Sequence, residues 1–415
     1  MRIWRIWCVG LAVVGGVLVA SGALLAQEPD GDWPQWRGPD RNGTLRLFTP
    51  PNPWPERLTE RWQVEVGEGH ATPVLVGSRI YTFSRVGEDE VMQSLDAASG
   101  DVIWRTSYPA PFSFDSSADP HGPGPKATPT FSAGRLYALG IGGVLSAFDA
   151  GDGEILWQTP APSVGPLFGT AASPLVDGNL VITHVGGHDD GALTAFDVST
   201  GAVRWAWPGD GPGYSSPILI ELDGTRQVIT QSQNHVVSVD AATGALLWQR
   251  PFLTPYAQNS IDAVVVDDQV IIAGTQMPTA AFRPLRVGNA WALEDVWESG
   301  EATFYMSNAL LVDRLLFGLS ERNSGQYALL DTTSGDTIWT GAGRQAESAA
   351  LVRAGQTVFS LEVDGELVVG EVTATAFEEI SRYEVADSPT WAQPTISGNR
   401  VFIKDLDTLT LWTFD

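Results

Sequence analysis

The chain has 415 residues, of which 43% are hydrophobic and 18% are charged, and its net charge is −25 at pH 7. This length and apolar content predict a large folded core and exclude an intrinsically disordered protein. An acidic surface repels phosphate groups, so the charge argues against binding to nucleic acid or to anionic lipid headgroups.

Residues 1–26 have the layout of a secretory signal peptide. Arg2 and Arg5 precede an apolar run over residues 9–25 that has small residues near its end. Cleavage after Ala23 or Ala26 fits this pattern. The alternative is an uncleaved membrane anchor, because the run is nearly long enough to span a bilayer. We predict an exported protein, periplasmic or extracellular, with no transmembrane domain after signal removal.

The only cysteine, Cys8, lies within this signal. No lipid-attachment motif such as Leu-x-Gly-Cys surrounds it, so lipidation at this position is not expected. The predicted mature protein therefore has no thiol, which excludes disulfides and cysteine chemistry.

Residues 27–60 form a proline-rich and tryptophan-rich arm. Its prolines, among them Pro34, Pro39, Pro50, Pro51, Pro53 and Pro55, favour extended chain over helix. We expect Trp33, Trp36 and Trp54 to anchor the arm to the side of the domain that follows. The alternative is a set of exposed aromatic side chains that capture a partner.

A repeat then dominates the chain. It occurs five times, as in SLDAASGDVIW and AFDVSTGAVRW, and in each copy glycine follows aspartate by four residues and tryptophan follows glycine by four. Five copies in identical spacing indicate duplication of one structural unit. The repeated positions are Asp96, Gly100 and Trp104; Asp149, Gly153 and Trp157; Asp197, Gly201 and Trp205; Asp240, Gly244 and Trp248; Asp331, Gly335 and Trp339.

Each copy is typical of a β-hairpin. The aspartate accepts backbone N–H groups in the turn, and the glycine supplies a left-handed conformation. A further pair of alternating strands with a short turn precedes each copy, as in ATPVLVGSRIYTFS, so each unit has four antiparallel strands, A to D. Degenerate units bring the number of predicted units to eight. Their outer strands carry Trp62, Trp104, Trp157, Trp205, Trp248, Trp297, Trp339 and Tyr383.

The two ends of residues 61–415 predict how the units are arranged. The last unit supplies strands A, B and C and then stops, whereas a spare strand D lies around Trp62. A sheet completed by one strand from each end closes a ring and removes exposed sheet edges. We therefore predict an all-β protein with an eight-bladed β-propeller over residues 61–415.

The pattern Ala-x-Asp-x-x-Thr-Gly-x-x-x-Trp, as in AFDVSTGAVRW, resembles the tryptophan-docking motif of propellers of the pyrroloquinoline quinone (PQQ) type. That superfamily includes quinoprotein alcohol dehydrogenases and the outer-membrane assembly protein BamB. The resemblance covers residues 61–415, and the segment DWPQWRGPDRNG (32–43) is similar to the start of many secreted bacterial members. It implies the fold, whereas members of one fold differ widely in activity.

The propeller places its loops on two faces. The D-to-A connections and the B–C hairpins share one, here called the connection face, and the A–B and C–D turns share the other, the turn face. The repeated aspartates and glycines fall on the turn face. All five histidines map to the connection face, namely His70, His121, His184, His188 and His235.

The connection face is therefore the candidate ligand or partner face. Small residues recur at the starts of the A strands, as packing against a central channel requires, while the first position varies between cationic, aromatic and hydroxyl side chains. This pattern is expected of a ligand mouth, and equally of positions that only contact solvent. The candidate residues are His70, Lys126, His184, His188, Asp189, Tyr214, His235, Tyr305, Trp391 and Lys404.

The segment HVGGHDDG offers His184, His188 and Asp189 as a weak metal site, since imidazole and carboxylate groups suit several divalent ions. However, two glycines in a hairpin argue against the helix that would bring both histidines to one side. A solvated hairpin is the favoured interpretation. No catalytic residue is assigned.

Three functions remain open. The favoured one is a non-catalytic, monomeric scaffold that binds a protein or a cell-envelope component. The resemblance also implies a quinoprotein oxidoreductase that uses PQQ and calcium, although the adjacent cysteines typical of such enzymes cannot occur here. The third is a glycan-binding propeller that uses Trp391, Tyr214 and Tyr305.

Overall fold

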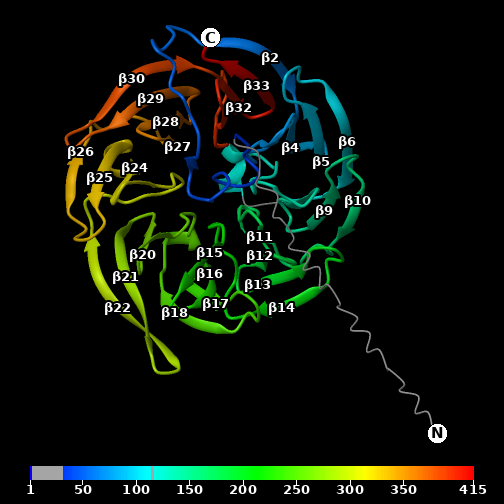
Figure 1. Cartoon of the computed structure of the whole chain (residues 1–415), viewed down its shortest axis with the longest axis vertical. Coiled ribbons are helices and arrows are strands. Elements are labelled where there is room, and N and C mark those ends of the chain that lie inside the picture. The colour runs from blue at the N-terminus through cyan, green and yellow to red at the C-terminus, as the bar shows by residue number, and fades with distance from the viewer. Residues whose placement is uncertain (2–30, 114–115, 166) are drawn as a thin grey trace.

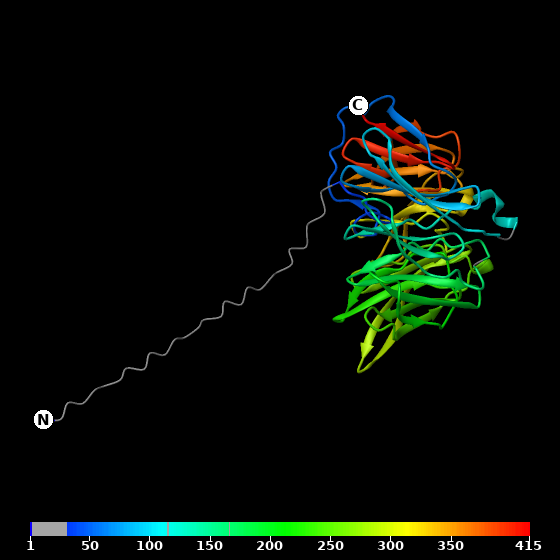
Figure 2. The same cartoon turned by 90° about the vertical axis from the view of Figure 1, so that its right-hand side faces the viewer.

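A computed structural model describes Met1 and residues 31–113, 116–165 and 167–415. The predicted signal peptide lies outside these residues, apart from Met1. Eight sheets surround a central channel (Figure 1), and Figure 2 shows the same ring from the side. The predicted all-β, eight-bladed propeller is confirmed. In the described ranges, no helix has the length and apolar character that crossing a membrane requires.

Each blade has four antiparallel strands, numbered from the channel outward. Blade 1 comprises β3 (Val74–Val76), β4 (Arg79–Val86), β5 (Asp89–Asp96) and β6 (Val102–Pro109). Blade 2 comprises β7 (Thr130–Ser132), β8 (Arg135–Leu139), β9 (Leu145–Asp149) and β10 (Ile155–Gln158). Blade 3 comprises β11 (Leu175–Asp177), β12 (Leu180–Gly187), β13 (Asp190–Asp197) and β14 (Val203–Trp207). Blade 4 comprises β15 (Ile218–Leu222), β16 (Thr225–Gln231), β17 (His235–Asp240) and β18 (Leu246–Pro251).

The second half of the ring follows the same plan. Blade 5 comprises β19 (Val264–Val266), β20 (Gln269–Gly274), β21 (Met277–Val287) and β22 (Ala290–Ser299). Blade 6 comprises β23 (Leu310–Val312), β24 (Leu315–Ser320), β25 (Gln326–Asp331) and β26 (Thr337–Thr340). Blade 7 comprises β27 (Ala349–Ala354), β28 (Thr357–Glu362), β29 (Glu366–Val372) and β30 (Phe377–Glu384). Short helices η1 (Ser116–His121), η2 (Pro255–Ala257) and η3 (Arg322–Ser324) lie in the connecting loops.

Blade 8 closes the ring. Its inner strands β31 (Thr395–Ser397), β32 (Arg400–Lys404) and β33 (Thr408–Thr413) come from the end of the chain, and its outer strand β2 (Thr59–Glu65) comes from the start. Trp62 pairs with Leu411 and Val64 with Leu409 in an antiparallel register. The predicted closure is confirmed.

The repeated motif joins neighbouring blades, as the turn after β13 shows. Hydrogen bonds from the side chain and backbone of Ser199 stabilise the ionised carboxylate and lower the pKa of Asp197 to about 2. Gly201 has a φ of +70°, and a Cβ atom there would lie 2.6 Å from the ring of Trp157 in the preceding blade. The indole of Trp157 also donates to the Val198 carbonyl at 3.1 Å. Trp62, Trp104, Trp205 and Trp297 contact the glycine turn of the next blade in the same way.

Blade 5 departs from this pattern. Its C–D hairpin, between β21 and β22, extends away from the ring (Figure 1) and has no aspartate–glycine turn. Trp248 of blade 4 therefore donates at 3.1 Å to Gln227 of its own blade, rather than to a carbonyl of the next blade.

Candidate functional site

The N-terminal arm closes the turn-face end of the channel. Trp33 is fully buried and forms a bridge with Leu75 of β3, and Asp32 accepts the Gly77 N–H in the following turn at 2.8 Å. Further along, β1 (Thr44–Leu45) pairs in parallel with the inner strand β27. The arm thus crosses the middle of the ring (Figure 1) and touches inner strands on opposite sides.

Two buried arginines of the arm hold the inner strands together. Arg37 donates to the Ala309 carbonyl at 2.6 Å, and Arg41 donates to the Ser173 and Pro174 carbonyls at 3.1 and 2.9 Å. Burial lowers the pKa of both, in Arg41 to about 10, while the nearby Asp262 carboxylate opposes this shift. Both guanidinium groups therefore stay charged at neutral pH.

The expected position of the arm on the side of the propeller is wrong for Trp33 and Trp36, which lie in the channel. The arm is held in the channel largely by hydrogen bonds to backbone carbonyl and N–H groups of the inner strands. Such bonds leave no pattern in the sequence. Trp54 does anchor the arm, since its ring packs against Phe359 and Phe414 with centroids 6.2 and 5.3 Å apart.

A series of six hydrogen bonds runs around most of the channel at the starts of the A strands, from blade 8 through blade 1 to blade 6. In each link, a backbone N–H of one blade donates to a side-chain oxygen of the next, which fixes the blades around the channel. The links run from Gln393 to Thr72 (3.1 Å), Thr72 to Thr128 (3.1 Å), Thr128 to Ser173 (2.9 Å), Ser173 to Ser216 (3.0 Å), Ser216 to Asp262 (2.7 Å) and Asp262 to Asn308 (2.8 Å).

The channel opens on the connection face into a cavity of about 660 Å³. Trp36 of the arm and Asp262 of blade 5 lie at its inner end, where the Trp36 indole donates to the Asp262 carboxylate at 2.6 Å. The other described lining residues are His70, Ala118, His121, Lys126, Phe168, Ala171, Tyr214, Ser216, Tyr256, Gln258, Ser260, Tyr305, Met306, Asn308 and Trp391. Because the arm fills the opposite end, the cavity is accessible from one face only.

One wall of the cavity carries nitrogen groups. Burial lowers the pKa of Lys126 to about 8, so this side chain remains charged at neutral pH. Burial and the charge of Lys404 lower the pKa of His70 to about 3, and burial followed by the charge of Lys126 lowers that of His121. The two imidazoles are therefore neutral at pH 7, and Lys126 provides the positive charge of this wall.

Another part of the cavity wall is aromatic. Burial raises the pKa of Tyr214 and raises that of Tyr305 to about 12, so both phenols are neutral. Phe168 lies beside Tyr214 with ring centroids 6.0 Å apart, and the Tyr305 hydroxyl donates to Gln258 at 3.1 Å. A second cavity of about 460 Å³ shares Tyr305, Met306 and Trp391 with the first. The hollow at this face therefore extends toward blades 6 and 7.

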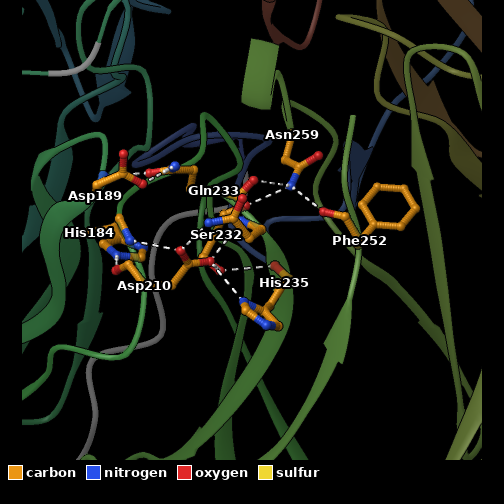
Figure 3. A network of polar contacts seen from close by, with 10 residues as sticks. His184, Asp189, Asp210, Ser232, Gln233, His235, Phe252 and Asn259 are labelled. Atoms are coloured by element: carbon orange, nitrogen blue, oxygen red, sulfur yellow. Dashed lines mark hydrogen bonds and ion pairs between the residues drawn. The ribbon is translucent and has the colours of Figure 1, made fainter. Parts of the chain in front are cut away.

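Beside the cavity, a polar network ties the loops of blades 3 and 4 together (Figure 3). The Asp210 carboxylate accepts hydrogen bonds from Ser232 at 2.7 Å and from His235 at 3.0 Å, and its carbonyl accepts one from His184 at 3.0 Å. Burial opposes ionisation of Asp210, but these bonds outweigh it and lower its pKa. These residues support the loops that form the cavity wall, but they do not themselves line the cavity.

The same network positions Asp189 and Gln233. The Gln233 amide donates to the Asp189 carboxylate at 2.7 Å and accepts the Asp189 N–H at 2.8 Å. Asn259 donates to the carbonyls of Ser232, Gln233 and Phe252 at 2.7, 3.2 and 3.1 Å. Amide side chains thus fix the hairpin that the sequence offered as a metal site.

The structure brings five of the ten candidate residues together around the cavity. These are His70, Lys126, Tyr214, Tyr305 and Trp391. His188 lies next to Tyr214, with ring centroids 6.4 Å apart. Lys404 is fully buried, and its ammonium donates to the carbonyls of Gly67, Asp405 and Leu406 at 3.0 to 3.2 Å.

The weak metal candidate is separated by its own hydrogen bonds. His184 is bonded to Asp210, His188 accepts the Leu167 N–H at 3.2 Å, and Asp189 is bonded to Gln233. A different trio within the described part of the chain, Glu362, Asp364 and Glu366, is close enough to share a cation. There, Arg382 already bonds to Glu362 at 3.0 Å and to Glu366.

Sequence reasoning missed Trp36 and the role of Asp262. An arm on the outside of the propeller, as the sequence predicts, leaves Trp36 out of the channel. A signal for the series of hydrogen bonds was present, since Thr72, Thr128, Ser173, Ser216 and Gln393 all precede proline at the starts of A strands.

Comparison with known proteins places this geometry in a family. The family model described as outer membrane protein assembly factor BamB matches residues 55–212 and 87–341. The chain belongs to this family. The assembly factor BamB of Shewanella oneidensis is 24% identical over 371 residues, which cover 83% of this chain and 85% of that protein. The quinohemoprotein alcohol dehydrogenase ADH-IIG of Pseudomonas putida is 29% identical over 167 residues, 37% of this chain and 22% of that enzyme.

Solved structures of the BamB and quinohemoprotein types share the fold. BamB from Moraxella catarrhalis has a TM-score of 0.61 at 17% identity and covers 86% of this chain and 98% of its own. The quinohemoprotein alcohol dehydrogenase from Comamonas testosteroni has a TM-score of 0.66 at 15% identity, with coverages of 92% and 80%. Fold alone therefore does not separate a scaffold of the BamB family from an enzyme.

The cavity residues do not fit a calcium-dependent quinone site. Calcium takes six to eight oxygen ligands and favours several carboxylates. Asp262 is the one carboxylate among the described lining residues, and it already accepts bonds from Trp36 and the Ser216 backbone. The Lys126 ammonium on the same cavity opposes a divalent cation. We derive no redox step for this site.

Proposed function

We propose that this protein is an exported, non-catalytic scaffold that holds a protein or another envelope component against the connection face, within the periplasm. Membership of the BamB family supports a binding role, and relatives of that name supply the finer proposal that the partner belongs to outer-membrane assembly. The observation that carries the proposal is the channel itself. The protein's own arm fills one end, and a cavity with aromatic and polar walls opens at the other.

Photo-crosslinking tests which surface is used. A photo-reactive residue at Tyr256, which is 76% exposed at the cavity, is expected to crosslink to an envelope partner in intact cells. The same residue at Ile103, which is 44% exposed on the outer strand β6, is the control and is expected to give no such product. Equal products from both positions, or none from Tyr256, would contradict the proposed face.

A second measurement tests the absence of catalysis. The purified protein is titrated with PQQ and calcium and assayed for dye-linked alcohol oxidation. We expect no turnover, because the lining offers a single carboxylate that is already hydrogen-bonded. Turnover that depends on both additions would replace the scaffold with the quinoprotein interpretation.

A further inference from the structure

The cavity offers flat aromatic surfaces from separate parts of the chain. Trp36 comes from the arm, Tyr214 from the start of blade 4, Tyr305 from that of blade 6 and Trp391 from that of blade 8. The faces of aromatic rings carry partial negative charge, which attracts the weakly positive C–H groups of a saturated sugar ring. A volume of about 660 Å³ lies in the range of small-ligand sites.

Three residues that line this cavity have a buried polar atom without a hydrogen-bond partner among the described residues, namely His70 (Nδ1), Tyr214 (Oη) and Ser260 (Oγ). His70 is 7% exposed, and its Nε2 is hydrogen-bonded to the His121 carbonyl at 2.8 Å, which assigns the ring proton to Nε2. Its Nδ1 atom therefore carries a lone pair, and it is buried without a hydrogen-bond partner. An unsatisfied buried acceptor is costly. Nδ1 is closed to water in this structure, so the His70 ring must turn slightly toward the cavity for a ligand hydroxyl to satisfy it.

A single ammonium faces the same space. The chain has two lysines, and Lys404 is fully used by three backbone carbonyls. Lys126 donates to the Phe168 carbonyl at 2.7 Å and to no other group among the described residues, which leaves two of its N–H bonds for a ligand anion. The charge of Asp262 does not oppose such an anion strongly, because Arg37 and Arg41 lie close enough to interact with it.

We propose that the central cavity binds an acidic sugar residue, whose carboxylate pairs with Lys126, whose hydroxyl donates to His70 Nδ1 and whose ring stacks on the aromatic wall. A flat aromatic acid would satisfy Lys126 but supplies no hydroxyl for His70. A neutral sugar would leave Lys126 unpaired. The adjoining 460 Å³ cavity gives room for a second sugar unit beyond Trp391. This inference rests on the proposed binding function, since it names what the connection face recognises.

Calorimetric titration with matched sugar pairs tests the inference, with tryptophan fluorescence as a second readout. The probes are D-glucuronate against D-glucose, D-galacturonate against D-galactose, and benzoate as the flat aromatic acid. We expect at least one of the uronates to bind at least tenfold more tightly than its neutral partner and than benzoate. Failure of both uronates to bind, equal affinity within each pair, or preference for benzoate would overturn the inference.

Variants assign the contacts. Lys126→Gln and Trp391→Ala are each expected to weaken uronate binding at least tenfold, while Lys126→Arg retains most of it. Arg57→Gln removes one positive charge at an exposed arm position and is expected to leave affinity unchanged. Thermal unfolding shows whether Lys126→Gln is folded. If it is not, the assignment of Lys126 is tested by the preference of the wild-type protein for uronates and by the affinity that Lys126→Arg retains. Unchanged affinity in a folded Lys126→Gln protein contradicts the assignment.

The outcome separates this inference from the proposed function. Crosslinking from Tyr256 without uronate binding would overturn the sugar ligand and leave the scaffold intact. Uronate binding without a crosslinked partner would support the sugar site. It would contradict the proposal that a protein partner binds at this face.

Discussion

The two faces of this propeller obey different rules. On the turn face, the same aspartate, glycine and tryptophan recur in blade after blade and make the same contacts, as at Asp197, Gly201 and Trp157. On the connection face, six of the eight residues that start the A strands line one cavity, and their chemistry ranges from the ammonium of Lys126 to the indole of Trp391. Repetition marks the part that holds the ring together, and variation marks the part that lines the cavity.

The largest loss of stability is expected for a variant of the turn-face motif. Trp205 is 8% exposed, stacks on the Gly244 turn of blade 4 and donates to the Ala241 carbonyl at 3.1 Å. Replacing it with alanine is expected to cost about 3–5 kcal/mol in the free energy of unfolding. Urea unfolding measures this loss. A Trp205→Ala protein with unchanged stability would show that the motif does not dock the blades.

The arm gives the next largest effect. Arg41→Ala removes charged hydrogen bonds to two buried carbonyls and is expected to cost about 2–3 kcal/mol. Arg46→Ala is the control on the same arm, because its ion pair with Asp40 is exposed and is expected to contribute less than about 1 kcal/mol. Equal losses in the two variants would contradict the role of the arm as the closure of the channel.

Acid stability tests the connection face. Above pH 6.5 the His70 ring is neutral in both states. Burial lowers the pKa of His70 to about 3 in the folded protein, so as the pH falls from 6.5 the unfolded chain takes up a proton first and stability decreases. At pH 5 this contribution amounts to about 2 kcal/mol. A His70→Gln protein should lose correspondingly less stability between pH 7 and 5, measured by urea unfolding. Parallel losses would contradict the buried neutral imidazole.

The smallest expected difference, between two glycine variants, separates backbone strain from docking. Gly178 and Gly201 both have positive φ in turns of blade 3, but a Cβ atom at Gly178 meets open space, whereas one at Gly201 meets the Trp157 ring. Gly178→Ala is expected to cost about 1 kcal/mol, and Gly201→Ala about 1–2 kcal/mol more. Thermal unfolding of the pair gives the difference directly. Equal losses of stability in the two variants would mean that the Trp157 ring moves aside at no cost in free energy.

The fold was predictable because the repeat is local. The turn at Asp197 and Gly201 depends on residues within a few positions of each other, so five copies expose it in the sequence. Closure through β2 was also predictable, since Trp62 lies in a strand that lacks the rest of its blade. The site was predictable only in part. The variable positions at the starts of the A strands show which residues surround the channel opening, but they do not show which of these side chains lie close together.

The sequence by itself therefore determined the number of blades, their closure and the face on which the chemistry gathers. Only the tertiary structure decided that Trp36 and two buried arginines seal the far end of the channel. It also decided that Lys404 is satisfied by backbone carbonyls while Lys126 faces the cavity. The physical reason is that the contacts of Arg37, of Arg41 with Pro174 and of Lys404 with Gly67 join residues more than a hundred positions apart. They are made to backbone groups that are the same in every residue, so no pattern along the chain records them.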